Sequence, residues 1–322
     1  MKALITGATG FIGSHLAEAL IGRGYDVSCL VRKTSSLKWL DGLEIGLVEG
    51  DCCDAGSLRG IKDFDYVFHL AGLTKAHRTS DFYTVNSVGT ENIIEAVAGS
   101  GRVKRFVYLS SLSAFGPNMA PHIPTEDEAP HPVSDYGRSK LRGETAVLMH
   151  ADKIPVTVLR PSVVYGPRER DFLWLFRMVK RGLLPYRGNG HLSLIYVNDL
   201  INAIILSAEN ENAAGKTYFV SDGTVYSNDE IIDEIASALG VRVLKIKAPE
   251  YFFSAIGFFG DRISSMTGRS VIFNGDKIKE IMYAEWVCDI TRINNELCFQ
   301  PGTKLRQGVK WTADWYRTRN WL

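Results

Sequence analysis

Neither a run of about 20 apolar residues nor an excess of charge of one sign occurs in this 322-residue sequence. Without such a run it predicts no transmembrane span. Lysine and arginine total 37 against 36 aspartates and glutamates, so the overall charge indicates no nucleic-acid partner and no general attraction to anionic membranes. Internal repeats and low-complexity tracts are absent as well. With 45% hydrophobic and 23% charged residues, the composition is typical of a globular chain with a large core.

Cysteine is also scarce. The five cysteines are odd in number and lack the spacing of metal ligands, and Cys52 and Cys53 are adjacent. This pattern suits neither a disulfide framework nor a zinc site. We therefore expect reduced thiols, no bound metal and a cytoplasmic location. We do not interpret the N-terminal apolar stretch as a signal peptide, because Gly7, Gly10 and Gly13 interrupt it and a charged helical pattern follows.

Short apolar runs alternate with helical patterns through the first half of the chain. The helical patterns cover Phe11–Arg23, Asp81–Ala98 and Asp135–His150. Continuous apolar strands separated by helices predict a parallel sheet covered on both faces, with its active site at the carboxyl ends of the strands. The predicted strands are Ala3–Thr6, Val27–Val31, Ile45–Glu49, Tyr66–Leu70, Arg105–Ser110 and Val156–Leu159.

A glycine-rich turn joins the first predicted strand to the first predicted helix. Glycine permits a tight turn at the first position, close approach of the backbone to a pyrophosphate at the second, and close helix–strand packing at the third. The N-terminus of the following helix faces the phosphates. The motif therefore predicts a dinucleotide site. The residues expected to contact the cofactor here are Gly7, Thr9, Gly10, Phe11, Ile12 and Gly13.

The spacing G-x-x-G-x-x-G, read together with the Tyr136–Lys140 pattern described below, resembles the extended short-chain dehydrogenase/reductase family of the NAD-dependent epimerase/dehydratase type. The resemblance covers nearly the whole chain and implies a Rossmann fold, a doubly wound parallel sheet. Without it, Asp51 would be interpreted as a turn residue and Asn86 as a helix-surface residue. The resemblance implies that Asp51 meets the adenine, that Asn86 supports the site, and that the nucleotide is lined by Cys52, Leu70, Ala71 and Gly72.

The end of the second predicted strand distinguishes between the two nicotinamide cofactors. NAD-preferring members place an acidic residue there to bind the ribose hydroxyls. This sequence has Val31 at that place, followed by Arg32 and Lys33. A guanidinium can bind a 2′-phosphate in bidentate fashion, whereas a carboxylate would repel it. We therefore expect Arg32 to favour NADP(H). The alternative is that Arg32 and Lys33 belong to a solvated basic loop without a role in binding, in which case NAD(H) is possible.

A catalytic pattern follows at the distance that the family resemblance requires. Tyr136 and Lys140 are four residues apart, so on a helix they share one face. A nearby ammonium and the positive nicotinamide are expected to lower the tyrosine pKa, which suits a general acid or base. Counting back from Gly116, Ser111 occupies the place of the family's catalytic serine or threonine, with Ser113 as a second candidate.

Three further positions bear on the nicotinamide and on the reaction. By resemblance, Pro161 and Val164 pack beside the nicotinamide. Leu112 stands where sugar dehydratases carry an acid, so dehydration is not expected. Leu192 stands where nucleotide-sugar enzymes carry an arginine for the diphosphate, and only His191 or Arg168 could compensate for its loss.

The segment from Tyr251 to Phe273 is dense in aromatic residues at helical spacing. This pattern usually indicates core, but it also suits a lid over an apolar substrate or a shallow membrane contact. All three interpretations stay open at this point.

The sequence as a whole predicts an oxidoreductase. Residues 1–165 are expected to form the NAD(P)-binding Rossmann domain, and residues 166–322 a smaller C-terminal α/β substrate lobe partly interleaved with the sheet. We expect hydride transfer between nicotinamide and a secondary alcohol or ketone of an apolar or non-nucleotide substrate, as in the hydroxysteroid-dehydrogenase and dihydroflavonol-reductase branch that the chain resembles. A sugar epimerase with retained NAD is the first alternative, and an NADP(H)-sensing regulator the second. The family resemblance also implies a homodimer.

Overall fold

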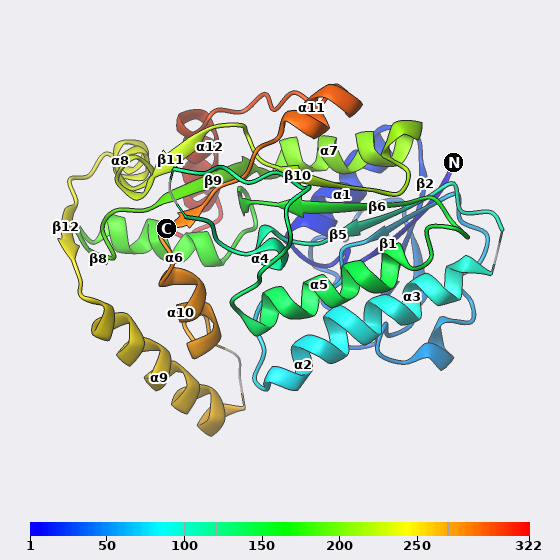
Figure 1. Ribbon diagram of the computed structural model, residues 1–322, viewed down its shortest axis with the longest axis horizontal. Helices are drawn as coiled ribbons and strands as arrows, with labels where there is room; N and C mark the ends of the chain where they lie inside the picture. Colours follow the sequence, from blue (N-terminus) through cyan, green and yellow to red (C-terminus); the bar gives the residue numbers. More distant parts are fainter. Residues whose placement is uncertain (100, 120, 269–270) are drawn as a thin grey trace.

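The computed structural model describes residues 1–99, 101–119, 121–268 and 271–322. Its main body is a seven-stranded sheet in the order β10-β6-β5-β4-β1-β2-β3 (Figure 1). Every neighbouring pair in this sheet is parallel, which confirms the predicted doubly wound α/β fold. The strands are β1 (Lys2–Thr6), β2 (Asp26–Val31), β3 (Gly46–Glu49), β4 (Tyr66–His69), β5 (Arg105–Leu109), β6 (Val156–Pro161) and β10 (Lys216–Val220).

Helices cover both faces of this sheet. Because successive side chains of a strand point to opposite faces, β1 contributes to two separate parts of the core. Ala3 and Ile5 pack in the cluster that includes α1 and α7, whereas Leu4 packs in the cluster that includes α3 and α5. These four helices are α1 (Phe11–Gly22), α7 (Val197–Glu209), α3 (Gly89–Ala98) and α5 (Asp135–Leu148).

The order of strands reverses between β1 and β4, because the chain builds β2 and β3 on one side and β5 and β6 on the other. In open parallel sheets, ligands bind at the carboxyl ends of the strands beside such a reversal. The segments that follow β1, β4 and β5 therefore meet at one edge.

Residues 79–98 form one helical run that changes pitch in its middle. Asn86 lies in a π-helical turn there and is buried. We predicted a single regular helix, and the difference arises where the Asn86 side chain hydrogen-bonds the backbone of Leu73. Such turns are frequent at functional sites. The run consists of α2 (Thr79–Tyr83), the π turn (Thr84–Val88) and α3.

A smaller lobe lies beside the main sheet (Figure 1, left). After β9 the chain returns through α7 to β10 in the main sheet before it re-enters the lobe at β11. The lobe's strands are β7 (Val163–Tyr165), β8 (Leu183–Tyr186), β9 (His191–Tyr196), β11 (Val225–Ser227), β12 (Leu244–Lys247) and β13 (Glu285–Trp286). The remaining helices are α4 (Leu112–Phe115), α6 (Asp171–Lys180), α8 (Asn228–Leu239), α9 (Glu250–Thr267), α10 (Gly275–Ile281), α11 (Thr291–Leu297) and α12 (Leu305–Thr318).

The aromatic segment forms α9, and the core interpretation of its side chains is wrong. Tyr251, Phe258, Phe259 and Met266 are all more than half exposed. Among the described helices, none combines the length and hydropathy that a bilayer-spanning helix requires.

Candidate active site

The glycine turn is packed so closely that side chains could not replace its glycines. Gly7 has a φ of +74°, and a Cβ there would lie 2.7 Å from the Ala71 backbone nitrogen. A Cβ on Gly13 would lie 2.3 Å from the Gly7 carbonyl oxygen. Gly10 precedes α1 and supplies no side chain to cap it, which leaves the first N–H groups of this helix free for an anion. This cradle fits the pyrophosphate of a dinucleotide.

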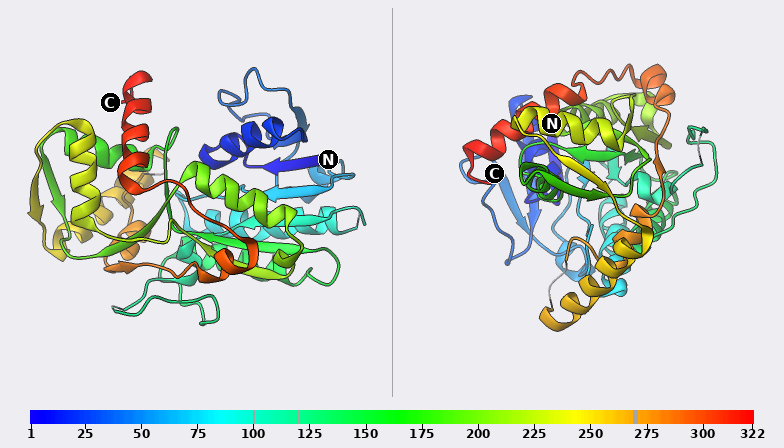
Figure 2. Two further views of the ribbon diagram at one scale, coloured as in Figure 1. Left: turned by 90° about the horizontal axis from the view of Figure 1, so that it is seen from above. Right: turned by 90° about the vertical axis from the view of Figure 1, so that its left-hand side faces the viewer.

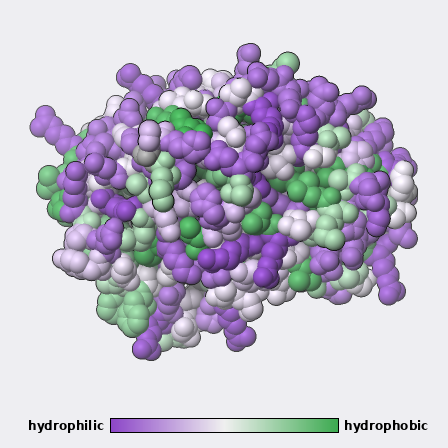
Figure 3. Space-filling model, in the orientation of Figure 1, coloured by the Kyte–Doolittle hydropathy of each residue, from purple (hydrophilic) through white to green (hydrophobic). Residues whose placement is uncertain are grey.

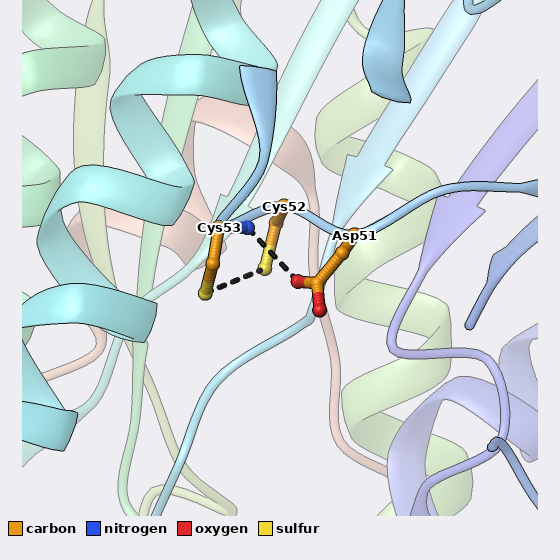
Figure 4. A group of neighbouring side chains, drawn as sticks. All are labelled: Asp51, Cys52 and Cys53. Carbon is orange, nitrogen blue, oxygen red and sulfur yellow. Dashed lines mark hydrogen bonds between the residues drawn. The ribbon is translucent and has the colours of Figure 1, made fainter. Parts of the chain in front are cut away.

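Arg32, Asp51 and Cys52 lie together after the carboxyl ends of β2 and β3. Arg32 is exposed and forms no ion pair with any residue in the described part of the chain, and it lies close enough to Cys52 to influence that thiol. The Asp51 carboxylate accepts a hydrogen bond of 2.9 Å from the Cys53 backbone nitrogen (Figure 4). The structure therefore brings together the three residues expected around the adenosine.

Asp51, Cys52 and Cys53 also form the one group of three neighbouring potential metal ligands within the described ranges (Figure 4). Burial raises the pKa of the Cys52 thiol to about 12, and burial also raises that of Cys53. Protonated thiols are poor ligands, since metals bind the thiolate. We assign no metal to this cluster.

Asn86 holds the loop that follows β4. Its amide accepts a hydrogen bond from Leu73 N (2.7 Å) and donates to Leu73 O (3.0 Å) and to the Ser139 hydroxyl (2.9 Å). The loop contains Ala71 and Gly72, and a Cβ on Gly72 would lie 3.6 Å from Lys140 Nζ. The loop therefore lies between the glycine turn and α5, the helix that carries Tyr136 and Lys140.

The Ser111, Tyr136 and Lys140 side chains converge beside this loop. Ser111 follows β5, caps α4 and hydrogen-bonds the Tyr136 phenol. Tyr136 and Lys140 lie one turn apart on α5, and Lys140 Nζ donates a hydrogen bond of 2.7 Å to the Leu109 carbonyl at the end of β5. One edge of the sheet therefore carries all three residues predicted to be catalytic, although their roles stay a prediction.

Burial changes the acid–base properties of both helix residues. Burial lowers the pKa of Lys140 from 10.5 to about 7, against an opposing effect of Glu144. Burial also raises the pKa of Tyr136, against the hydrogen bond from Ser111. Among the chain's own residues, Lys277 is the cation whose charge lowers the pKa of Tyr136. The lowering expected from Lys140 together with the positive nicotinamide stays a prediction.

Helix α10 supplies residues that sequence reasoning missed. The two oxygens of Asp276 accept hydrogen bonds from the backbone nitrogens of Asp135 (2.8 Å) and Tyr136 (3.0 Å), at the start of α5. Glu280 accepts a hydrogen bond of 2.7 Å from Ser134 Oγ, whose oxygen caps α5. Carboxylates are stabilising at a helix N-terminus, so α10 fixes the end of the helix that carries Tyr136.

An ion pair between an exposed lysine and a buried glutamate completes this contact. Lys277 Nζ lies 2.8 Å from a Glu280 oxygen, and its side chain is 52% exposed while that of Glu280 is 6% exposed. Burial by itself would raise the pKa of Glu280, but Lys277, Ser134 and Ser113 together lower it below 4.5. Lys277 and Glu280 both act on Tyr136 electrostatically, so the lobe reaches the tyrosine predicted to be catalytic.

We expect Glu280→Gln to destabilise the protein by about 2 kcal/mol, because it removes the charge from a buried hydrogen-bonded network. A lowered pKa means that this stabilisation is fully present above about pH 4.5 and is lost as the pH falls through the pKa of the folded state. Thermal unfolding of both proteins between pH 7 and pH 3 measures the difference, which should shrink at the acid end. Glu95→Gln, at an exposed site on α3, is the matched control. A constant difference at every pH would contradict the assignment.

The residues predicted to distinguish between reactions have the following surroundings. Leu112 is buried in the core, and its side chain has no acidic proton to donate. Leu192 packs against the core from β9. The two residues considered as substitutes for a diphosphate arginine are both paired: His191 lies 3.0 Å from Glu285, and Arg168 bonds to Ser14 and Glu18 on α1. Their compensating role stays a prediction.

Pro161 ends β6 and Val164 lies in the middle of β7, one on each side of Ser162. Ser162 Oγ is buried and has no partner among the described residues. Because β6 pairs with β5 in parallel, this segment follows the same end of the sheet as Ser111, which comes directly after β5. Contact of Pro161 and Val164 with the nicotinamide stays a prediction.

Comparison with known proteins agrees with this geometry. A family model described as the NAD dependent epimerase/dehydratase family matches residues 3–221. Ceramide reductase of Caulobacter vibrioides is 29% identical over 99% of this chain and 95% of its own length. UDP-glucose 4-epimerase of Vibrio cholerae is 28% identical over 98% of this chain and 96% of its own length. The solved structure of UDP-glucose 4-epimerase from Thermotoga maritima has a TM-score of 0.81 at 22% identity, covers 99% of this chain and 100% of its own, and shares the fold.

Proposed function

This chain belongs to the NAD-dependent epimerase/dehydratase family, and we propose that it transfers hydride between nicotinamide and a secondary alcohol or ketone of an apolar, non-nucleotide substrate. It is an enzyme that uses NAD or NADP, as the family does.

Each catalytic side chain has a role that its surroundings support. Bound NAD(P) would supply or accept the hydride, held by the glycine turn. Tyr136 exchanges a proton with the substrate oxygen, and the Ser111 hydroxyl, which hydrogen-bonds the phenol, orients that oxygen. Lys140, whose depressed pKa leaves it able to lose a proton near neutrality, binds the ribose and relays protons to Tyr136.

The observation that carries the choice of substrate is the environment of β9. By family resemblance, Leu192 stands where nucleotide-sugar enzymes carry an arginine for the diphosphate. The two cations that could compensate, His191 and Arg168, are paired with Glu285 and Glu18. A diphosphate would lose a bidentate contact there. The similarity to a ceramide reductase supports a lipid-like substrate, but a sugar epimerase is almost as similar, so identity alone does not decide.

NADP(H) is the proposed cofactor, because the Arg32 side chain is exposed near Cys52 and forms no ion pair among the described residues. Arg32→Glu should weaken NADPH binding about tenfold or more, and it should reduce the ratio of NADPH affinity to NADH affinity. Fluorescence titration with both nucleotides measures this change. Lys33→Glu reverses the same charge one residue away, where Lys33 lies 3.3 Å from Glu49, and should leave the preference unchanged. Equal effects of the two variants would refute the role of Arg32.

A sugar epimerase with retained NAD is the alternative, favoured by the relatives that carry that name. Denaturing the freshly purified protein and identifying any released nucleotide separates the two functions. Stoichiometric NAD would favour the epimerase, whereas an empty site that binds NADPH would favour the reductase. Retention of both Tyr136 and Lys140 makes a purely regulatory NADP(H) sensor the weakest alternative. We also propose a homodimer, on the family resemblance, and a cytoplasmic location, on the cysteine pattern.

A further inference from the structure

Helix α9 turns its large apolar side chains outward. They lie on one continuous side of the helix, because separations of three, four and seven residues recur among them. Figures 1 and 2 show α9 projecting from the lobe, and Figure 3 shows hydrophobic residues gathered over it at the lower left. The exposed residues are Tyr251 (77%), Phe252 (37%), Phe258 (58%), Phe259 (63%), Ile263 (52%) and Met266 (86%).

The inward side of α9 carries small residues instead. Gly257, Gly260 and Ser264 are its buried positions. A Cβ on Gly260 would lie 1.9 Å from the Phe273 carbonyl oxygen, and one on Gly257 would lie 2.8 Å from the Ile278 side chain. The helix therefore packs closely against the chain leading into α10. This contact fixes which side of α9 faces solvent, so the exposed apolar surface is a built feature.

Of the charged residues on α9, the two acids have partners elsewhere, and only a cation lies within the apolar surface. Glu250 pairs with Arg187 (3.5 Å), and Asp261 accepts a hydrogen bond of 3.1 Å from Gly275 N. Arg262 has no acidic partner among the described residues, and its guanidinium lies 5.6 Å from the centroid of the Phe258 ring. It is four residues from both Phe258 and Met266, so it stands within the apolar surface.

We propose that α9 is an interfacial helix that docks this enzyme on an anionic lipid bilayer. Phenylalanine, isoleucine and methionine would enter the boundary between headgroups and acyl chains. Arg262 would extend its guanidinium to a lipid phosphate while its stem stays in the apolar layer. A second copy docked through the same surface fits less well, because the acids of α9, Glu250 and Asp261, already have partners and would leave Arg262 without a counter-charge.

The inward side of α9, opposite this surface, contacts the surroundings of the candidate active site at two places. Helix α10, against which α9 packs, carries the Asp276 and Glu280 carboxylates that hold the start of α5. His77, in the loop after β4, hydrogen-bonds Ser264 of α9 (3.1 Å). Docking through α9 would therefore hold the site beside the bilayer, where an apolar substrate would be found. The docking itself does not depend on the proposed reaction.

Vesicle binding tests the docking without any substrate. The full chain is sedimented with sucrose-loaded vesicles of phosphatidylcholine alone or with about 30 mol% phosphatidylglycerol. We expect binding to the anionic vesicles, a loss of more than about tenfold in the double variant Phe259→Glu, Ile263→Glu, and a loss of about fivefold in Arg262→Gln. The matched control is Met149→Glu with Leu47→Glu, which adds the same charge at exposed apolar residues elsewhere.

Two outcomes would overturn the proposal. One is the same vesicle binding, or none, in the wild type and in the α9 double variant. The other is a concentration-dependent dimer in ultracentrifugation that the α9 substitutions abolish while vesicles bind neither protein, since that result would assign the surface to a second copy. Circular dichroism of each variant verifies that it is folded. Turnover of a water-soluble ketone tests the proposed function separately, so either idea can fail alone.

Discussion

Replacing Tyr136 with phenylalanine should lower kcat by about 10³-fold and leave the Kd of the nucleotide within about twofold. The hydroxyl is the group proposed to exchange a proton with the substrate, and Ser111 hydrogen-bonds it directly. The ring would remain in place, packed 6.0 Å from the Phe82 ring between centroids. Steady-state turnover and a fluorescence titration with NADPH measure the two quantities.

Tyr25→Phe is the matched control for this variant. It removes a phenol that donates a hydrogen bond of 2.6 Å to Glu209, on the far side of the fold from α5. That substitution should leave kcat unchanged. Turnover retained by Tyr136→Phe would refute the catalytic assignment, and lost nucleotide binding would show that the substitution disturbs the site instead of its chemistry.

The largest loss of stability is expected from Arg160→Met. Glu144 and Arg160 form a buried ion pair, with side chains 2% and 7% exposed and an N–O distance of 2.7 Å. Ser110 donates a further hydrogen bond to the same carboxylate. Methionine would leave a buried carboxylate without its cation, which costs about 3–5 kcal/mol. Urea unfolding followed by circular dichroism gives the free energy of unfolding.

A second substitution separates charge from packing. Adding Glu144→Leu to Arg160→Met removes the orphaned carboxylate, and most of the lost stability should return. Lys245→Met provides a comparison at a partly exposed pair with Asp233, where the loss should stay below about 1 kcal/mol. If the double variant is as unstable as Arg160→Met, the lost packing of the side chains is responsible and not the charge.

The parts of the site that sequence could predict are those encoded locally. Gly7, Gly10 and Gly13 stand in one turn, and Tyr136 and Lys140 in one helical turn, so spacing alone places them on the same loop or face. The parallel sheet followed from apolar runs separated by helices, and it then brought these two motifs to one edge. Local pattern and topology were sufficient together.

The contacts of α10 could not be predicted in this way. Asp276 reaches backbone nitrogens about 140 residues earlier in the chain, and no local pattern marks it as the partner of α5. The orientation of α9 was hidden for a different reason. Its apolar residues cover much of the helix circumference, and only the packing of Gly257 and Gly260 decides which side stays outside.

The pKa of Tyr136, the tyrosine proposed to be catalytic, could not be predicted from the sequence either. Spacing places Lys140 near Tyr136, but spacing does not give the burial of either group. In the structure, burial is the first cause of both pKa shifts, and it raises one and lowers the other. A pattern of residue types describes which charges are near, whereas the cost of removing them from water depends on the completed fold.

The return of the chain to β10 limits how this protein can be divided. The edge strand of the sheet and the covering helix α7 both come from the second half of the sequence, between two passages through the lobe. A fragment ending near residue 165 would therefore expose β6 as an unpaired edge and uncover one face of the sheet, which favours aggregation. Exchanging the lobe between relatives therefore requires replacing two separate segments, one before α7 and one after β10. New substrate specificities would arise by changes in these two segments while the main sheet stays the same.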